Sequence, residues 1–299
     1  MRVSKPLLQL PIQFDGERLA AEVSALPPAA WCPHPQGYVG NEAVPLVSLG
    51  GTINDDFVGP MAPTQNLDHC PYIMSVMKEL DGVWGRSRLM GLAAGANVPR
   101  HNDLHYYWRT HLRIHVPVIT NPGVVFTVGG DSVHMSAGEC WVFDSFTPHE
   151  VRNAGSEQRI HLVLDTVGGE RLWNLVDEAE SGAVATGIAD LQPAESEELR
   201  YEQLNSPIVM SPWEIRQHFD FILEHAIPHP RLDAVRKRLD RFATAWRAAW
   251  AEFGNSDAGI PTYHLLIEQV RGDLNALGAE QIKLDKNVTL LRTIEAFVF

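Results

Sequence analysis

Apolar residues between positions 88 and 167 recur in short runs, several of which alternate with polar residues, and Gly, Pro, Asn and Asp separate the runs. Alternation with a period of two is typical of strands that bury one face. Runs of this length with turn residues between them are typical of an all-β sandwich or barrel. The sequence therefore predicts a mainly β unit, with strands expected in residues 88–95, 111–120, 124–130, 132–143 and 159–167.

Helical spacing of apolar residues appears on both sides of this unit. Residues 14–26 and 72–80 predict helices, whereas residues 44–51 predict a strand that ends in glycines. Residues 261–277 predict a further helix, and residues 288–299 fit either a helix or a strand. Six apolar residues at steps of three or four predict one more helix, whose stripe forms core or a dimer contact: Leu232, Val235, Leu239, Phe242, Trp246 and Trp250.

The chain becomes acidic and rich in small residues after about position 179, which is typical of a linker. We therefore expect three parts. Residues 1–178 form the β domain with its N-terminal helices, residues 179–205 form the linker, and residues 206–299 form a helical C-terminal domain. The expected fold class is α+β, mainly β with helices.

Charge and composition exclude several classes of partner. Lys and Arg number 24 and Asp and Glu 37, so the net charge is −13 and the chain lacks the basic surface of a nucleic-acid or anionic-membrane binder. No apolar run is long enough to span a membrane, and the first residues lack a signal-peptide cleavage site, so we expect a cytoplasmic protein. Cys32, Cys70 and Cys140 are scattered and odd in number, which favours reduced, structural thiols.

Histidine is concentrated in one part of the chain, because seven of the thirteen histidines lie between positions 101 and 161. His101 and Asp103 are two residues apart, so in an extended segment both side chains point to the same side. With His149 from another strand, they would supply the two imidazoles and one carboxylate of a non-heme Fe(II) centre. The alternative is an ordinary histidine and aspartate in a solvated loop.

Two of the expected strands separate polar from apolar side chains. Arg159 and His161 share one face of residues 159–165, and His111, Arg113 and His115 share one face of residues 111–116. Arginine is suited to bind a carboxylate through two hydrogen bonds. These faces therefore either line a site or simply meet water, as polar faces of antiparallel strands often do.

Four motifs in this order, PRHND, LRIHVPV, GECWVFDSFTPHEV and QRIHLVLD, resemble the Fe(II)/2-oxoglutarate dioxygenases, in the branch of the aspartyl/asparaginyl β-hydroxylases and bacterial L-proline cis-4-hydroxylases. The resemblance covers residues 83–168, and the helical tail is similar to the C-terminal helical domain of the proline hydroxylases. It implies a double-stranded β-helix, or cupin-like jelly roll, whose mouth holds iron.

The resemblance also implies roles for individual residues. His101, Asp103 and His149 match the iron ligands, Arg159 matches the anchor of the distal carboxylate of 2-oxoglutarate, and His115 matches a histidine that holds its other end. The implied cofactors are Fe(II), 2-oxoglutarate and O2. The implied reaction hydroxylates an aliphatic carbon of an amino acid, proline-like or acidic, or of a residue in a peptide, and releases succinate and CO2.

Substrate contacts are expected from Arg113 or Arg100, which would meet a carboxylate, and from His105 and Trp108. Packing at the barrel rim is the alternative for the last two. The animal-type aspartyl/asparaginyl enzymes have no aspartate at the position of Asp103, whereas the proline hydroxylases do. The aspartate here therefore favours a resemblance to the proline hydroxylases. His134 and His161 are expected to be structural or to support the ligands.

Two other functions fit the same residues. One is a non-catalytic β-barrel that binds a ligand, for which no metal and no 2-oxoglutarate binding are expected. The other is a cupin metalloenzyme that uses His111 and His115 as ligands and needs no 2-oxoglutarate. We also expect no nucleic-acid or membrane partner, and the C-terminal helices are the candidate surface for a homodimer.

Overall fold

The computed structural model describes residues 3–34 and 37–299, which divide into two compact units. The first unit comprises residues 1–103 and 110–205, and the second comprises residues 104–109 and 206–299. The segment expected to be a linker, residues 179–205, is thus assigned to the first unit. The short helix α3 (Tyr106–Thr110) crosses the division.

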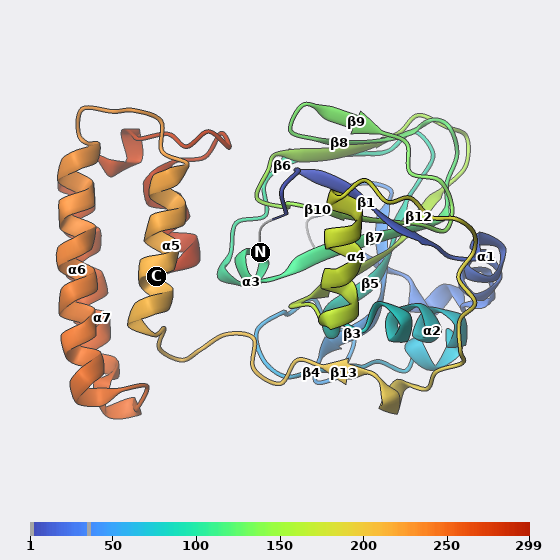
Figure 1. Ribbon diagram of the computed structural model, residues 1–299, viewed down its shortest axis with the longest axis horizontal. Coiled ribbons are helices and arrows are strands. Elements are labelled where there is room, and N and C mark those ends of the chain that lie inside the picture. The colour runs from blue at the N-terminus through green and yellow to red at the C-terminus, as the bar shows by residue number, and fades with distance from the viewer. Residues whose placement is uncertain (1–2, 35–36) are drawn as a thin grey trace. The chain divides into compact units, whose positions relative to one another are not determined.

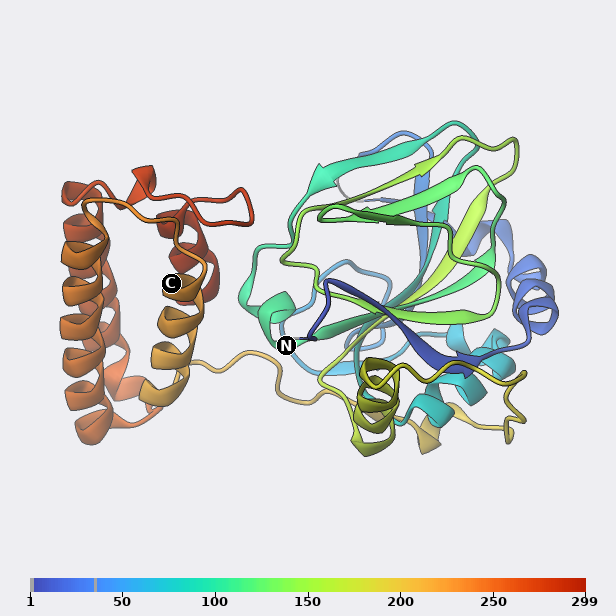
Figure 2. The same cartoon turned by 45° about the horizontal axis from the view of Figure 1, so that its top comes forward.

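The first unit contains two β-sheets, which Figure 2 shows as layers packed face to face. The large sheet has the order β1-β10-β7-β12-β5-β3-β2, with β13 beside β5 and β4 beside β3, and the small sheet has the order β6-β11-β8-β9. All pairings except β5 with β13 are antiparallel. The strands of the large sheet are β1 (Leu7–Gln13), β2 (Cys32–Pro33), β3 (Asn41–Leu49), β4 (Met61–Pro63), β5 (Val83–Leu92), β7 (Leu112–Ile119), β10 (Glu139–Phe143), β12 (Arg159–Thr166) and β13 (Arg200–Tyr201). Those of the small sheet are β6 (Asn97–His101), β8 (Val124–Val128), β9 (Asp131–Val133) and β11 (His149–Asn153).

Apolar side chains of both sheets meet in one cluster, which contains Leu92 of β5, Phe126 of β8, Phe143 of β10 and Val151 of β11. Three helices belong to the same unit: α1 (Gly16–Ala25), α2 (Pro71–Leu80) and α4 (Glu170–Glu180). Helix α1 contacts β7 and α4 contacts β1, so both pack on the large sheet (Figure 1). Short 3-10 turns lie at Pro28–Ala30, Leu67–His69 and Ser196–Glu198.

The polar face predicted for β12 does not meet water. Every residue from Arg159 to Thr166 is buried, because β12 is central in the large sheet and is covered on both faces. His111 and His115 are likewise only 5% and 6% exposed. The solvent-facing alternative is therefore wrong for these residues, and buried arginine and histidine need partners or a ligand.

The second unit is helical, with α5 (Pro212–Glu224), α6 (Leu232–Phe253), α7 (Ile260–Ala276) and α8 (Leu290–Phe297) and 3-10 turns at Asp257–Gly259 and Ala279–Gln281. The predicted stripe lies on α6, where Val235, Leu239, Phe242 and Trp246 are buried inside this unit. Trp246 packs on Tyr263 at 4.5 Å between ring centroids, and its indole N–H donates to the Met210 carbonyl. The stripe is thus core of the unit.

The last residues, which fitted helix or strand, form α8, where the Thr289 hydroxyl accepts from the Arg292 backbone N–H. The cysteines are free, with Cys70 and Cys140 buried. Within residues 3–34 and 37–299, no helix is both long enough and apolar enough to span a membrane.

Candidate active site

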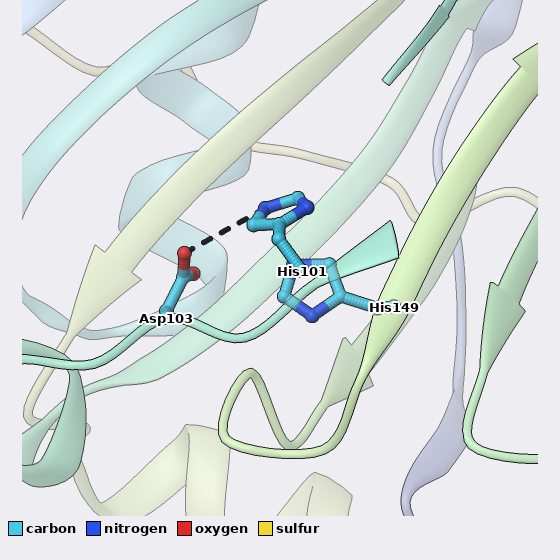
Figure 3. Close-up of side chains that lie close together, drawn as sticks. All are labelled: His101, Asp103 and His149. Atoms are coloured by element: carbon cyan, nitrogen blue, oxygen red, sulfur yellow. Dashed lines mark ion pairs between the residues drawn. The ribbon is translucent and has the colours of Figure 1, made fainter. Parts of the chain in front are cut away.

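Two histidines face each other on neighbouring strands of the small sheet. β6 and β11 are antiparallel, and His101 pairs directly with His149 in their register. Residues opposite each other on adjacent strands point to the same face. The two imidazole rings are accordingly 4.3 Å apart between centroids, and His149 is buried (Figure 3).

Asp103 joins the histidines from the loop that follows β6. Its backbone N–H donates to the Ser145 carbonyl oxygen at 3.0 Å, which fixes the loop beside the end of β10. One Asp103 carboxylate oxygen, Oδ1, lies 3.8 Å from Nε2 of His101. One ligand atom from each of His101, Asp103 and His149 lies within 4.8 Å of the others, and among the described residues this is the only such group of His, Cys, Asp or Glu.

Both histidines use the ring nitrogen that points away from this group to bond the backbone. Nδ1 of His101 lies 2.9 Å from the Pro99 carbonyl oxygen, and Nδ1 of His149 lies 3.0 Å from that of Thr147. A neutral ring that donates from Nδ1 keeps the Nε2 lone pair for a metal, as is usual for metal-bound histidine. Burial lowers the pKa of His149 to about 4, so this ring is neutral near pH 7.

Arg113 of β7 fixes the aspartate. Its Nη1 donates to Oδ2 of Asp103 at 2.5 Å, and its Nε and Nη2 donate to Asp165 of β12 at 2.7 and 3.0 Å. Burial raises the pKa of Asp165, but Arg113 outweighs this and the pKa lies below its ordinary value. We expected Arg113 to meet a substrate carboxylate, whereas its guanidinium pairs with two carboxylates of the chain itself. Arg113 therefore orients the candidate ligand Asp103.

A second polar cluster lies on the same face of β12, at its other end. Arg159 is 4% exposed, and its Nε and Nη2 have no hydrogen-bond partner among the described residues. Nδ1 of His115 and both ring nitrogens of His161 are also buried without a partner. Burial lowers the pKa of Arg159 to about 9, which leaves it charged near pH 7. Such groups are costly unless a ligand binds them.

The two clusters are linked through aromatic contacts. His115 lies 5.0 Å from Phe143, and Phe143 lies 5.0 Å from His149, between ring centroids. His115 is in turn 5.6 Å from His161. Burial and then the Arg159 charge lower the pKa values of His115 and His161 well below the ordinary range. Ring contacts through His115 and Phe143 thus connect His149 with the cluster that contains the buried arginine.

This arrangement fits the group that the sequence resemblance implies. Two imidazoles and one carboxylate on one side of a metal suit Fe(II) and leave positions for small ligands. The unpartnered donors of Arg159, His115 and His161 suit a carboxylate that extends from the metal. His161, expected to be structural or supporting, lies in this cluster with both ring nitrogens buried and without a partner.

Other predicted residues lie elsewhere. Arg100 is half exposed, and it donates to the Gly129 carbonyl and pairs with Glu150 at 3.6 Å. His105 and Trp108 belong to the second unit, where their rings are 6.0 Å apart. His111, the ligand of the cupin alternative, forms a short buried contact with Glu202. These contacts do not support a metal site at His111.

Comparison with known proteins bears on this geometry. Residues 55–168 match the family described as aspartyl/asparaginyl β-hydroxylase. This range contains His101, Asp103, His149 and Arg159. The resemblance is confirmed. L-proline cis-4-hydroxylase of Rhizobium meliloti (strain 1021) is 26% identical over 162 residues, 52% of this chain and 58% of that protein. The chain thus spans less than two thirds of the length of this curated relative.

Similar solved structures include a 2OG-Fe(II) oxygenase-family oxidoreductase from Burkholderia pseudomallei, with 16% identity, a TM-score of 0.41, and coverage of 56% of this chain and 87% of that one. A Pseudomonas putida prolyl-4-hydroxylase has 15% identity, a TM-score of 0.39, and coverage of 56% and 95%.

Proposed function

We propose that this chain is an Fe(II)- and 2-oxoglutarate-dependent hydroxylase that acts on an amino acid or on an amino-acid residue in a peptide. The observation that carries the proposal is the combination of two features on facing sheets. His101, Asp103 and His149 present three ligand atoms to one point, and Arg159 lies buried with two unpartnered donors. The family match over residues 55–168 and the proline hydroxylase relative support it.

When bound, Fe(II), 2-oxoglutarate and O2 supply the oxidising chemistry, whose products are the hydroxylated substrate, succinate and CO2. His101, Asp103 and His149 hold the metal. Arg159 binds the distal carboxylate of 2-oxoglutarate through its free donors, and His115 contacts the other end. Arg159 and His115 are buried, which excludes water from them and strengthens each charge-assisted hydrogen bond.

In this proposal, the two facing sheets of the first unit form a double-stranded β-helix. The helices of the second unit form a C-terminal helical domain. A cytoplasmic location, a homodimer through the C-terminal helices, and the boundaries at residues 178 and 205 stay predictions. So do contacts of His105 and Trp108 with the substrate.

The test is an anaerobic calorimetric titration of 2-oxoglutarate into metal-free protein with and without Mn(II), which replaces Fe(II) and does not turn over. We expect binding that needs the metal, with one metal per chain. Asp103→Ala should abolish metal binding and Arg159→Met should abolish 2-oxoglutarate binding with the metal site intact. Arg152→Gln, on the outward face of β11, is the matched control.

A non-catalytic binding module would show no metal stoichiometry and no 2-oxoglutarate binding. A cupin enzyme without a co-substrate would bind metal and remain active after Arg159→Met. Either result would refute the proposal. Succinate formation after exposure to O2, stimulated by members of an amino-acid and peptide panel, would then identify the substrate.

A further inference from the structure

The six residues that follow Asp103 belong to the other unit of the chain. Asp103 ends one stretch of the first unit, residues 104–109 are part of the second unit, and the first unit resumes at Thr110. The chain thus enters the second unit directly after a candidate metal ligand and comes back just before β7. Metal and 2-oxoglutarate binding do not by themselves require this excursion.

Side chains of this segment pack on helix α5. The Tyr106 hydroxyl donates to Oε1 of Glu214 at 2.5 Å, and the Tyr106 ring lies 5.7 Å from that of His218 between centroids. The guanidinium carbon of Arg109 lies 4.0 Å from the ring centroid of Phe221. Glu214, His218 and Phe221 are spaced by four and three residues, so they share one face of α5. That face therefore holds the segment at two points.

The hydrogen bond between Tyr106 and Glu214 is charge-assisted. Burial, and then the Glu214 carboxylate, raise the pKa of Tyr106, so the phenol keeps its proton near pH 7 and donates it. His218 is only 4% exposed, and burial lowers its pKa to about 4, so a neutral ring packs on Tyr106. A hydrogen bond to a carboxylate contributes more than one between neutral groups. The Tyr106–Glu214 bond is therefore the anchor of the segment.

The two ends of the segment are fixed unequally in the first unit. At the returning end, His111 forms a short buried contact with Glu202, and β7 begins at the next residue. At the leaving end, Asp103 lies in a loop, held by one backbone hydrogen bond to Ser145 and by the Arg113 guanidinium. A shift of the segment would therefore be taken up at Asp103 rather than at the strand. Residues of a functional site must hold their positions to within about half an ångström.

We propose that Tyr106 and Glu214 are positioning residues for the metal ligand Asp103, so that helix α5 of the second unit influences the metal affinity of the first. The inference rests on the proposed function and gives the C-terminal helices a role in it. Coupling between two sites is reciprocal. Metal bound by Asp103 should therefore also tighten the docking of residues 104–109 on α5.

The first test measures Mn(II) affinity by calorimetry in the whole chain. Tyr106→Phe removes only the hydroxyl and should weaken Mn(II) binding about fivefold or more, at the lower end of typical couplings between sites. Tyr263→Phe is the matched control, because it removes a hydroxyl that donates to the Gly254 carbonyl at 2.6 Å elsewhere in the second unit. It should lower the stability in urea by a similar amount and leave the Mn(II) affinity unchanged. Wild-type affinity in Tyr106→Phe, or an equal loss in both variants, would overturn the inference.

Variants of Glu214 separate positioning from a general loss of stability. Glu214→Ala removes the acceptor and should weaken Mn(II) binding as much as Tyr106→Phe. The double variant should bind no more weakly than either single one, because both changes remove the same hydrogen bond. Glu214→Gln keeps an acceptor oxygen and should restore most of the affinity, and Asp220→Ala, at an exposed position of α5, should have no effect. Additive losses in the double variant would contradict a shared role.

Hydrogen exchange tests the reciprocal effect. Mn(II) should slow amide exchange in residues 106–110 about fivefold or more in the wild-type chain, and less than about twofold in Tyr106→Phe. Equal exchange with and without metal in the wild type, or equal slowing in both proteins, would overturn the inference. A wild-type chain that binds no Mn(II) would instead refute the proposed function, so the two failures are separable.

Discussion

On one face of β12, the charged side chains at the two ends differ in whether they have a partner within the chain. At one end, Asp165 accepts two hydrogen bonds from Arg113, which also holds Asp103. At the other end, Arg159 keeps two donors without a partner, beside the unpartnered nitrogens of His161. Both ends are buried, so solvent does not explain the difference. Charges paired within the chain orient a ligand residue, whereas a buried charge without a partner is suited to bind something from outside.

The largest effect is expected at the paired end. Asp165→Asn removes one partner of a buried ion pair and leaves Arg113 undercompensated, so the free energy of unfolding should fall by about 3 kcal/mol. Urea unfolding measures this. A loss below about 1 kcal/mol, the typical cost of an ordinary substitution, would contradict the orienting role of the pair.

Arg159→Met tests the unpaired end. The change removes a buried charge that has no partner and keeps an apolar side chain of similar length, so the free energy of unfolding should stay the same or rise. The affinity for 2-oxoglutarate should nevertheless fall by about 100-fold, because a buried charge-assisted pair is lost. Unfolding curves measure the stability, and the Mn(II)-dependent titration measures the affinity for 2-oxoglutarate. Destabilisation with unchanged affinity would make Arg159 structural.

The neutral histidines at this end predict a pH dependence. Burial holds the pKa values of His115 and His161 well below 6.5 in the folded protein, so the unfolded state binds more protons at low pH. Their contribution is complete above about pH 6.5, and each histidine then costs about 1.4 kcal/mol of stability per pH unit of further acidification. His161→Gln should therefore flatten the dependence between about pH 6.5 and pH 5.5 by about 1 kcal/mol. An unchanged slope of unfolding free energy against pH would show that His161 takes up a proton as readily in the folded as in the unfolded protein.

The smallest effect is expected at Arg100. Its pair with Glu150 is half exposed on both sides, and exposed pairs contribute less than about 1 kcal/mol. Arg100→Gln should change the free energy of unfolding by less than about 0.5 kcal/mol. It should also leave KM for the substrate unchanged, since the side chain of Arg100 is directed to Glu150. A raised KM in this variant would return the expected substrate contact to Arg100.

Much of the fold followed from local pattern. The alternation in residues 159–165 and 111–116 identified strands and grouped their polar side chains on one face, as β12 and β7 have them. The α6 stripe followed from helical spacing. Alternation did not decide whether these polar faces meet water or the interior, because burial depends on which strands and helices cover the sheet.

The candidate site shows the same division. The spacing of His101 and Asp103 with the distant His149 indicated a ligand set, and the resemblance to the Fe(II)/2-oxoglutarate dioxygenases pointed to Arg159. The partners of Arg113 did not follow, because they depend on the pairing of strands far apart in sequence.

The sequence by itself determined which residues form strands and helices, and which side chains share a face, because periodicity is a local property of the backbone. It also determined the ligand types available for a metal and for a carboxylate. Only the tertiary structure decided which charges find a partner, since that depends on strand register and on the bulge in β5 between Trp84 and Ser87, opposite Leu164 and Thr166 of β12. That decision separates Arg113, which orients Asp103, from the buried guanidinium group of Arg159, whose Nε and Nη2 have no partner.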